Sequence, residues 1–165
     1  MTGEGLPPSG FDPGMPKHGW VGEILRRFGD GGALPAGYRA YFECFNDGRY
    51  YEAHDVLEHV WLGCHDAHAT YYKGLIQIAG AFVHLQKNFE YPGHPKHARR
   101  LQPAVRLFAL GVKNIAPFGP RHLGFDVEAA VTISESFSAR IRRSQFSENP
   151  WAPSSKPRLP ALRAM

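Results

Sequence analysis

The sequence has little cysteine and no long apolar run, and each absence narrows what the chain can be. Its 165 residues include only two cysteines, which form neither a CxxC motif nor a disulfide framework. A reducing, cytoplasmic setting is therefore expected. No run reaches the roughly 20 apolar residues that a bilayer span needs. The first residues also lack the apolar centre of a secretory signal, so we expect no contact with a membrane.

Strong charge of one sign is lacking as well. The net charge is +4 and the pI about 9.2, a mild basic bias that allows an anionic partner without requiring one. Basic residues gather in 96–106 and 140–143. No known DNA- or RNA-reading motif accompanies them, so solvated helix faces explain them more simply. Weak, non-specific nucleic-acid binding stays an alternative, and a protein partner or a second copy of the chain stays open.

Helical periodicity is what the sequence does contain. The stretch Gly74–Leu85 reads GLIQIAGAFVHL, with apolar residues on every side and only Gln77 and His84 as interruptions. A helix that is apolar all round is a buried helix. Further segments have apolar residues three or four apart, in 38–45, 50–62, 98–112 and 130–141. With no clear strand signal, we predict an all-α, multi-helical bundle of about five helices around a buried central helix.

Composition divides the chain into three parts. Residues 1–32 are rich in Gly and Pro and should be largely disordered, although 20–28 carries a weak helical signal. Residues 33–143 form the helical domain. Within it, Pro95 should open a helix that Pro103 kinks or splits, and Asp126 should cap the last helix. From Ser144 to Met165 the chain turns to Pro, Ser and Arg, which predicts a disordered tail.

Two neighbouring segments place polar residues on facing sides. His54, Glu58 and Trp61 are spaced by four and three, so they share one face of a helix, and Gln77 and His84 share a face of the central helix. An antiparallel pairing of the two helices brings these faces together. We therefore predict a polar cluster inside the hairpin. Tyr51 and Lys73 complete the candidate pocket.

These same segments resemble a known family. The run FNDGRYYEAHDVLEHVW, followed by YYKGLIQIAGAFVHL, is similar to the bacterial and archaeal "domain of unknown function 309". That family has an Asn-x-Gly segment that leads into His-(acid)-x-x-Glu-x-x-Trp, and then Gly-Leu-Ile-Gln. The matching residues are Asn46, Gly48, Tyr50, Tyr51, His54, Asp55, Glu58, Trp61, Gly74, Leu75, Ile76 and Gln77. The resemblance covers about 38–110 and implies a small multi-helical domain with no assigned activity.

Three interpretations of the cluster stay open. It is a structural network in which Glu58 accepts from His54 or Lys73 and Gln77 bridges. Alternatively, His54 and Glu58 bind a divalent metal ion with His84 or Gln77, and metal-dependent hydrolysis is then the first activity to expect. In the third interpretation a small polar ligand binds, and His54 acts as acid or base with Glu58 orienting it.

A second group of candidate metal ligands lies in the connection between the two helices. It consists of Cys64, His65, Asp66 and His68. A His-x-x-His pair with an Asp between its members can bind zinc or nickel, but on an exposed loop such a short motif is more often incidental.

Overall fold

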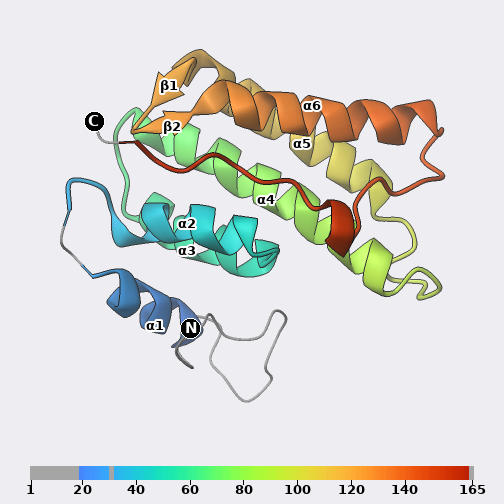
Figure 1. The fold of residues 1–165 in the computed structure, drawn as a ribbon, viewed down its shortest axis with the longest axis horizontal. Coiled ribbons are helices and arrows are strands. Elements are labelled where there is room, and N and C mark those ends of the chain that lie inside the picture. The colour runs from blue at the N-terminus through green and yellow to red at the C-terminus, as the bar shows by residue number, and fades with distance from the viewer. Residues whose placement is uncertain (1–18, 30–31, 164–165) are drawn as a thin grey trace.

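The computed structural model describes residues 19–29 and 32–163 of the chain. Over these residues the chain forms six α-helices, two short 3₁₀ turns and one pair of two-residue strands (Figure 1). The elements in order are α1 (Gly19–Phe28), α2 (Ala36–Asn46), α3 (Tyr50–Leu62), α4 (His68–Glu90), α5 (Leu101–Ile115), η1 (Ala116–Phe118), β1 (Arg121–His122), β2 (Phe125–Asp126), α6 (Val127–Arg143) and η2 (Pro153–Ser155). The predicted all-α bundle is confirmed.

Helix α4 lies at the centre of the bundle, with α2 and α3 on one side and α5 and α6 on the other (Figure 1). The predicted central helix is the middle of this longer element, and Leu75, Ile78 and Phe82 are fully buried there. The burial is not complete all round, however. One strip of α4, which includes Gln77 and His84, is only partly buried. None of the helices in the described ranges is long and apolar enough to cross a membrane.

Helices α4 and α5 approach each other at a pair of glycines. A Cβ atom on Gly74 would lie 2.5 Å from Ile115 Cγ2 and 2.9 Å from the backbone oxygen of Gly111. A Cβ atom on Gly111 would in turn lie 2.6 Å from Ile78 Cγ1 and 2.9 Å from the backbone oxygen of Gly74. Only hydrogen fits at either position. The Gly of the Gly-Leu-Ile-Gln motif therefore sets the distance between α4 and α5.

The expected helix start at Pro95 is wrong. Residues 95–99 form hydrogen-bonded turns, and α5 begins at Leu101, the first of its residues to be buried. Pro103 is then the third residue of the helix. Backbone N–H groups in the first turn have no intrahelical partner, so Pro103 neither kinks nor splits α5. The predicted cap is confirmed, because the Asp126 carboxylate accepts from the Ala129 N–H at 3.2 Å.

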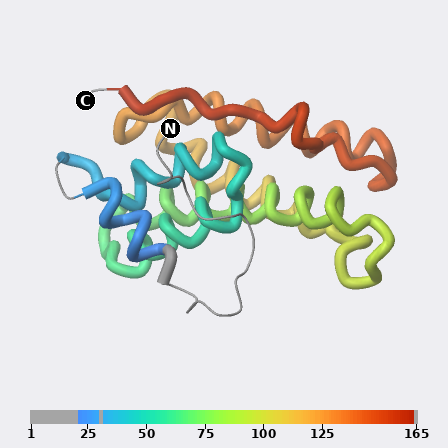
Figure 2. Tube along the Cα trace, turned by 60° about the horizontal axis from the view of Figure 1, so that its bottom comes forward, coloured from blue at the N-terminus to red at the C-terminus, as the bar shows by residue number. Residues whose placement is uncertain are grey.

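Residues 144–163, which we name the C-terminal strap, run back along the bundle to the β1–β2 hairpin (Figure 2). Trp151 is buried and donates from Nε1 to the Tyr50 hydroxyl at 2.9 Å. The Asn46 amide accepts from the Leu159 N–H at 2.7 Å and donates to its carbonyl at 2.9 Å. The structure thus differs from the expected disordered tail. The composition of the strap is typical of disordered segments, but the buried side chains of Trp151 and Leu159 and the two hydrogen bonds of Asn46 hold it against the bundle.

The N-terminal flank contains a helix within the part that is described. Residues 1–18 lie outside the described residues, but Gly19–Phe28 forms α1, where the weak periodicity had suggested a helix. Val21 and Ile24 are buried, and α1 packs against α2 and α3.

Candidate functional site

The residues of the predicted pocket lie along one stripe of α3 and one stripe of α4, which together we name the α3–α4 face. It is made by Tyr51, His54, Glu58, Trp61, Lys73, Gln77, Gly80 and His84. The two helices meet where the His54 ring passes over Gly80: a Cβ atom there would lie 3.9 Å from His54 Cδ2. The spacing argument predicted that these side chains form a cluster. It placed them inside the hairpin, whereas seven of the eight are partly exposed and Lys73 is exposed.

The partner of His54 is Asp55. His54 Nδ1 lies 2.9 Å from Asp55 Oδ1, with the histidine side chain 32% exposed and the aspartate only 2%. The second oxygen of Asp55 is buried without a hydrogen-bond partner among the described residues. Burial of an unpaired carboxylate destabilises the folded protein, so Asp55 depends on its contact with His54. Glu58, which we expected to orient His54, makes no hydrogen bond or ion pair within the described ranges.

The Asp55 contact determines which nitrogen of His54 faces outward. An ionised carboxylate only accepts hydrogen bonds, so in the neutral imidazole the proton belongs on Nδ1 and the lone pair on Nε2. The imidazole is also packed against the Tyr51 ring, with the centroids 6.5 Å apart and the planes at 28°. His54 is thus an oriented, partly exposed side chain that can accept a proton or a hydrogen bond.

Gln77 is turned toward α5 instead of His54. Its Oε1 accepts from Asn114 Nδ2 at 2.7 Å. This bond lies one turn from the Gly74–Gly111 contact, so the last residue of the Gly-Leu-Ile-Gln motif ties α4 to α5. For Gln77 the structural interpretation is the one that the geometry supports.

His84 is bonded to the segment that precedes α5. Arg100 Nη1 lies 2.9 Å from His84 Nδ1, and Arg100 Nε donates to His97 at 2.8 Å. A guanidinium group only donates, so Nδ1 of His84 must accept. Burial, then the charges of Arg100 and Arg106, lower the pKa of His84 to about 4. His84 is therefore neutral at pH 7.

The expected metal-binding set is not assembled. The part of the chain that the structure describes has no group of three or more His, Cys, Asp or Glu side chains that could hold a metal ion. His54 and His84 each use Nδ1 for a different partner, a carboxylate and a guanidinium. The helix spacing of these residues was correct, but spacing alone does not tell which neighbour occupies each side chain.

The predicted metal ligands of the loop motif also contact different partners. Cys64 Sγ donates to Asp66 at 3.2 Å, whereas His68 Nδ1 lies 2.9 Å from Nε2 of His122 on β1. Burial and the neighbouring His68 lower the pKa of His122. Nearby, the Tyr38 hydroxyl donates to the backbone oxygen of Leu123 at 3.1 Å. These contacts attach the β1–β2 hairpin to α2 and to the start of α4, and no spacing pattern in the sequence points to His122 as a partner.

The sequence of helices α2, α3 and α4 is similar to that of a known domain family. Residues 38–93 match the model of the family described as Domain of unknown function (DUF309). This segment is similar to the DUF309 domain over those residues. The resemblance expected from the sequence is confirmed, although the match ends before α5. Comparisons with curated proteins and with solved structures found no match. The DUF309 match therefore contains the α3–α4 face, whereas Asn114 and Arg100 come from outside it.

Proposed function

We propose that the α3–α4 face of the DUF309 domain binds a small polar ligand. His54 is the group that accepts a proton or hydrogen bond from this ligand, and Asp55 is the residue that positions His54. The observation that carries this proposal is the His54–Asp55 contact, in which a buried carboxylate holds a partly exposed imidazole at 2.9 Å. The same order of groups keeps a histidine in one tautomer when it acts as a general base.

The surroundings of His54 support a ligand that donates hydrogen bonds. Glu58 lies one turn further along the same face of α3, is partly exposed, and offers two acceptor oxygens that no described residue uses. Gly80 has no side chain, so the imidazole approaches the α4 backbone closely, with His54 Cδ2 3.9 Å from the position that a Cβ atom would take. A polyol or an amine, which presents several donors, suits an imidazole lone pair beside a carboxylate.

The structural interpretation explains other members of the predicted cluster. Gln77 and His84 are each joined to the α5 side of the bundle, by Asn114 and Arg100. A purely structural role for His54 would need a similar link to another helix. Its hydrogen-bond partner is the next residue of its own helix, so the contact orients the ring without joining two elements.

The first test of the proposal is the tautomer of His54 in ¹⁵N NMR spectra. We expect a proton on Nδ1 in the wild type, and a mixture of tautomers in Asp55→Asn, whose amide can donate as well as accept. The matched control is His59→Gln, an exposed substitution on the same helix, which should leave the His54 signals unchanged. A proton on Nε2 in the wild type would disprove the positioning role of Asp55.

The second test uses ethanolamine and glycerol as probes of the surface. We expect ethanolamine, and more weakly glycerol, to shift the amide signals of Gly80 and Glu58 in a saturable manner. His54→Gln should remove the shifts and His59→Gln should keep them. Equal shifts in His54→Gln, or none in the wild type at high millimolar concentration, would overturn the proposal.

A further inference from the structure

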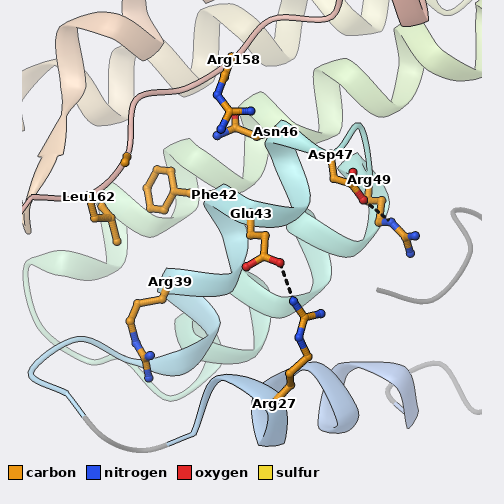
Figure 3. A pocket seen from close by; sticks show the side chains of 10 residues that line it. Arg27, Arg39, Phe42, Glu43, Asn46, Asp47, Arg49, Arg158 and Leu162 are labelled. Atoms are coloured by element: carbon orange, nitrogen blue, oxygen red, sulfur yellow. Dashed lines mark hydrogen bonds and ion pairs between the residues drawn. The ribbon is translucent and has the colours of Figure 1, made fainter. Parts of the chain in front are cut away.

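A second candidate site lies away from the α3–α4 face and shares no residue with it. A pocket of about 700 Å³ opens between α1, α2 and the C-terminal strap (Figure 3). Sites for small molecules commonly span about 300–1,000 Å³. The strap forms one wall, from Arg158 to Leu162, and α2 forms another, which includes Phe42. The pocket therefore depends on a segment outside the DUF309 match.

The charges around this pocket do not balance. Four arginines and two carboxylates line it. Arg27 pairs with Glu43 at 2.6 Å, and Arg49 pairs with Asp47 at 2.8 Å. These two pairs cancel, which leaves two positive charges.

The two remaining arginines differ in what they bind. Arg39 donates to the backbone oxygens of Phe28, Gly29 and Leu34. Its guanidinium group is therefore occupied by the backbone between α1 and α2. Arg158 has no hydrogen bond or ion pair within the described chain. Its side chain reaches down from the strap toward α2 and Asn46 (Figure 3). One guanidinium group at the pocket is thus available to a ligand.

We propose that this pocket binds a small molecule in which a carboxylate or phosphate group is attached to an apolar ring or chain. The anionic group pairs with Arg158, whose planar fork of N–H donors matches two oxygens of such a group. The apolar part lies against Phe42 and Leu162, which face the same pocket (Figure 3). The carboxylates of Glu43 and Asp47 already have arginine partners, so they do not cancel the charge of Arg158.

Binding is coupled to the docking of the strap. Leu159, the residue after Arg158, is held by both polar atoms of the Asn46 side chain. When the strap is released, Arg158 and Leu162 leave the pocket together. A ligand that binds the docked strap must therefore favour docking, because it interacts only with that state.

The experiment uses phenyl phosphate as the probe, with the intact chain and calorimetry or NMR titration. We expect saturable binding, which Arg158→Gln weakens about tenfold or more, as for the loss of a hydrogen bond between charged groups. Arg99→Gln removes the same charge from an exposed position elsewhere and should change the affinity less than about twofold. Phenol, which lacks the anionic group, should not bind measurably. Hydrogen exchange of the Leu159 amide should slow when phenyl phosphate is added.

Several outcomes would overturn the proposal. Unchanged affinity in Arg158→Gln, with the thermal midpoint of the wild type, would show that Arg158 does not contact the anion. Equal weakening by Arg158→Gln and Arg99→Gln would show a general charge effect. Binding of phenol as tight as that of phenyl phosphate would exclude the anionic group as the determinant. Exchange at Leu159 that is unaffected by the probe would show that the strap is not a wall of the site.

Discussion

Gly74 and Gly80 lie less than two turns apart on α4, and the two positions have opposite surroundings. A Cβ atom on Gly74 would meet Ile115 Cγ2 at 2.5 Å and backbone of α5 at 2.9 Å. A Cβ atom on Gly80 would meet only the ends of two side chains, Leu107 at 3.3 Å and His54 at 3.9 Å. The same residue type thus lies against the α5 backbone at Gly74 and against two side chains, one of them the candidate site's His54, at Gly80. The two sides can be tested separately.

The largest effect is expected from Gly74→Ala. The added methyl group overlaps atoms of α5 that include a backbone oxygen, which cannot rotate away. Overpacking of this kind typically costs about 1–3 kcal/mol, and we expect the upper end or more because Gly111 faces the same crossing. The free energy of unfolding from urea titration measures it. Stability within about 0.5 kcal/mol of the wild type would show that the two helices can separate at little cost.

Gln77 and Asn114 provide the next test of the packing side. Replacement of either residue by Leu leaves a partly buried amide without its partner and should cost about 1–3 kcal/mol. Replacement of both removes the need for a partner and should cost less than the sum of the single changes. A double-mutant cycle measures the coupling. Additive effects would mean that the hydrogen bond contributes nothing to stability.

Helical periodicity explains why the burial of α4 could be predicted from the sequence and the hydrogen-bond partners of its polar residues could not. The apolar residues of Gly74–Leu85 showed from sequence alone that this helix is central, because burial depends on the pattern within one helix. The partner of each polar side chain depends on a different segment. Asn114 and Arg100 lie far along the chain, on α5 or just before it, and no spacing rule connects them to Gln77 or His84.

The misassigned partner of His54 has a related cause. Residues three or four apart share a helix face and adjacent residues do not, so the spacing rule pointed to Glu58. The buried Asp55 carboxylate nevertheless lies 2.9 Å from Nδ1 of the imidazole. The C-terminal strap escaped prediction for a different reason. Composition averages over many residues, whereas Trp151 and Leu159 anchor the strap as single buried side chains.

His84 provides a smaller, pH-dependent test at the boundary between the two sides. Its pKa is about 4 in the folded protein, below the usual 6.5 of the unfolded chain. The unfolded state therefore binds more protons between these values, and stability should fall as the pH falls from 6.5 toward 4. Because the side chain is partly exposed, we expect solvent screening to leave a loss of only about 1 kcal/mol.

The measurement for His84 is the difference in thermal midpoint between the wild type and His84→Gln across this pH range. The glutamine can still accept from Arg100 but does not titrate. We expect the wild type to lose about 2–4 °C more than the variant between pH 7 and pH 4.5. Parallel midpoints for the two proteins would show that His84 takes up its proton equally in the folded and unfolded states.

The smallest effect on stability is expected from Gly80→Ala. This variant also best separates the packing of α4 against α5 from the candidate site beside His54. Alanine is favoured over glycine inside a helix by about 0.8–1.0 kcal/mol. The Leu107 methyl group at 3.3 Å can shift by rotation, so most of this gain should remain and the variant should be slightly more stable than the wild type. The new methyl group also occupies the space beside His54. We therefore expect Gly80→Ala to weaken the shifts caused by ethanolamine while it raises the urea midpoint. A variant that is both more stable and unchanged in its response to ethanolamine would place the ligand elsewhere than beside Gly80.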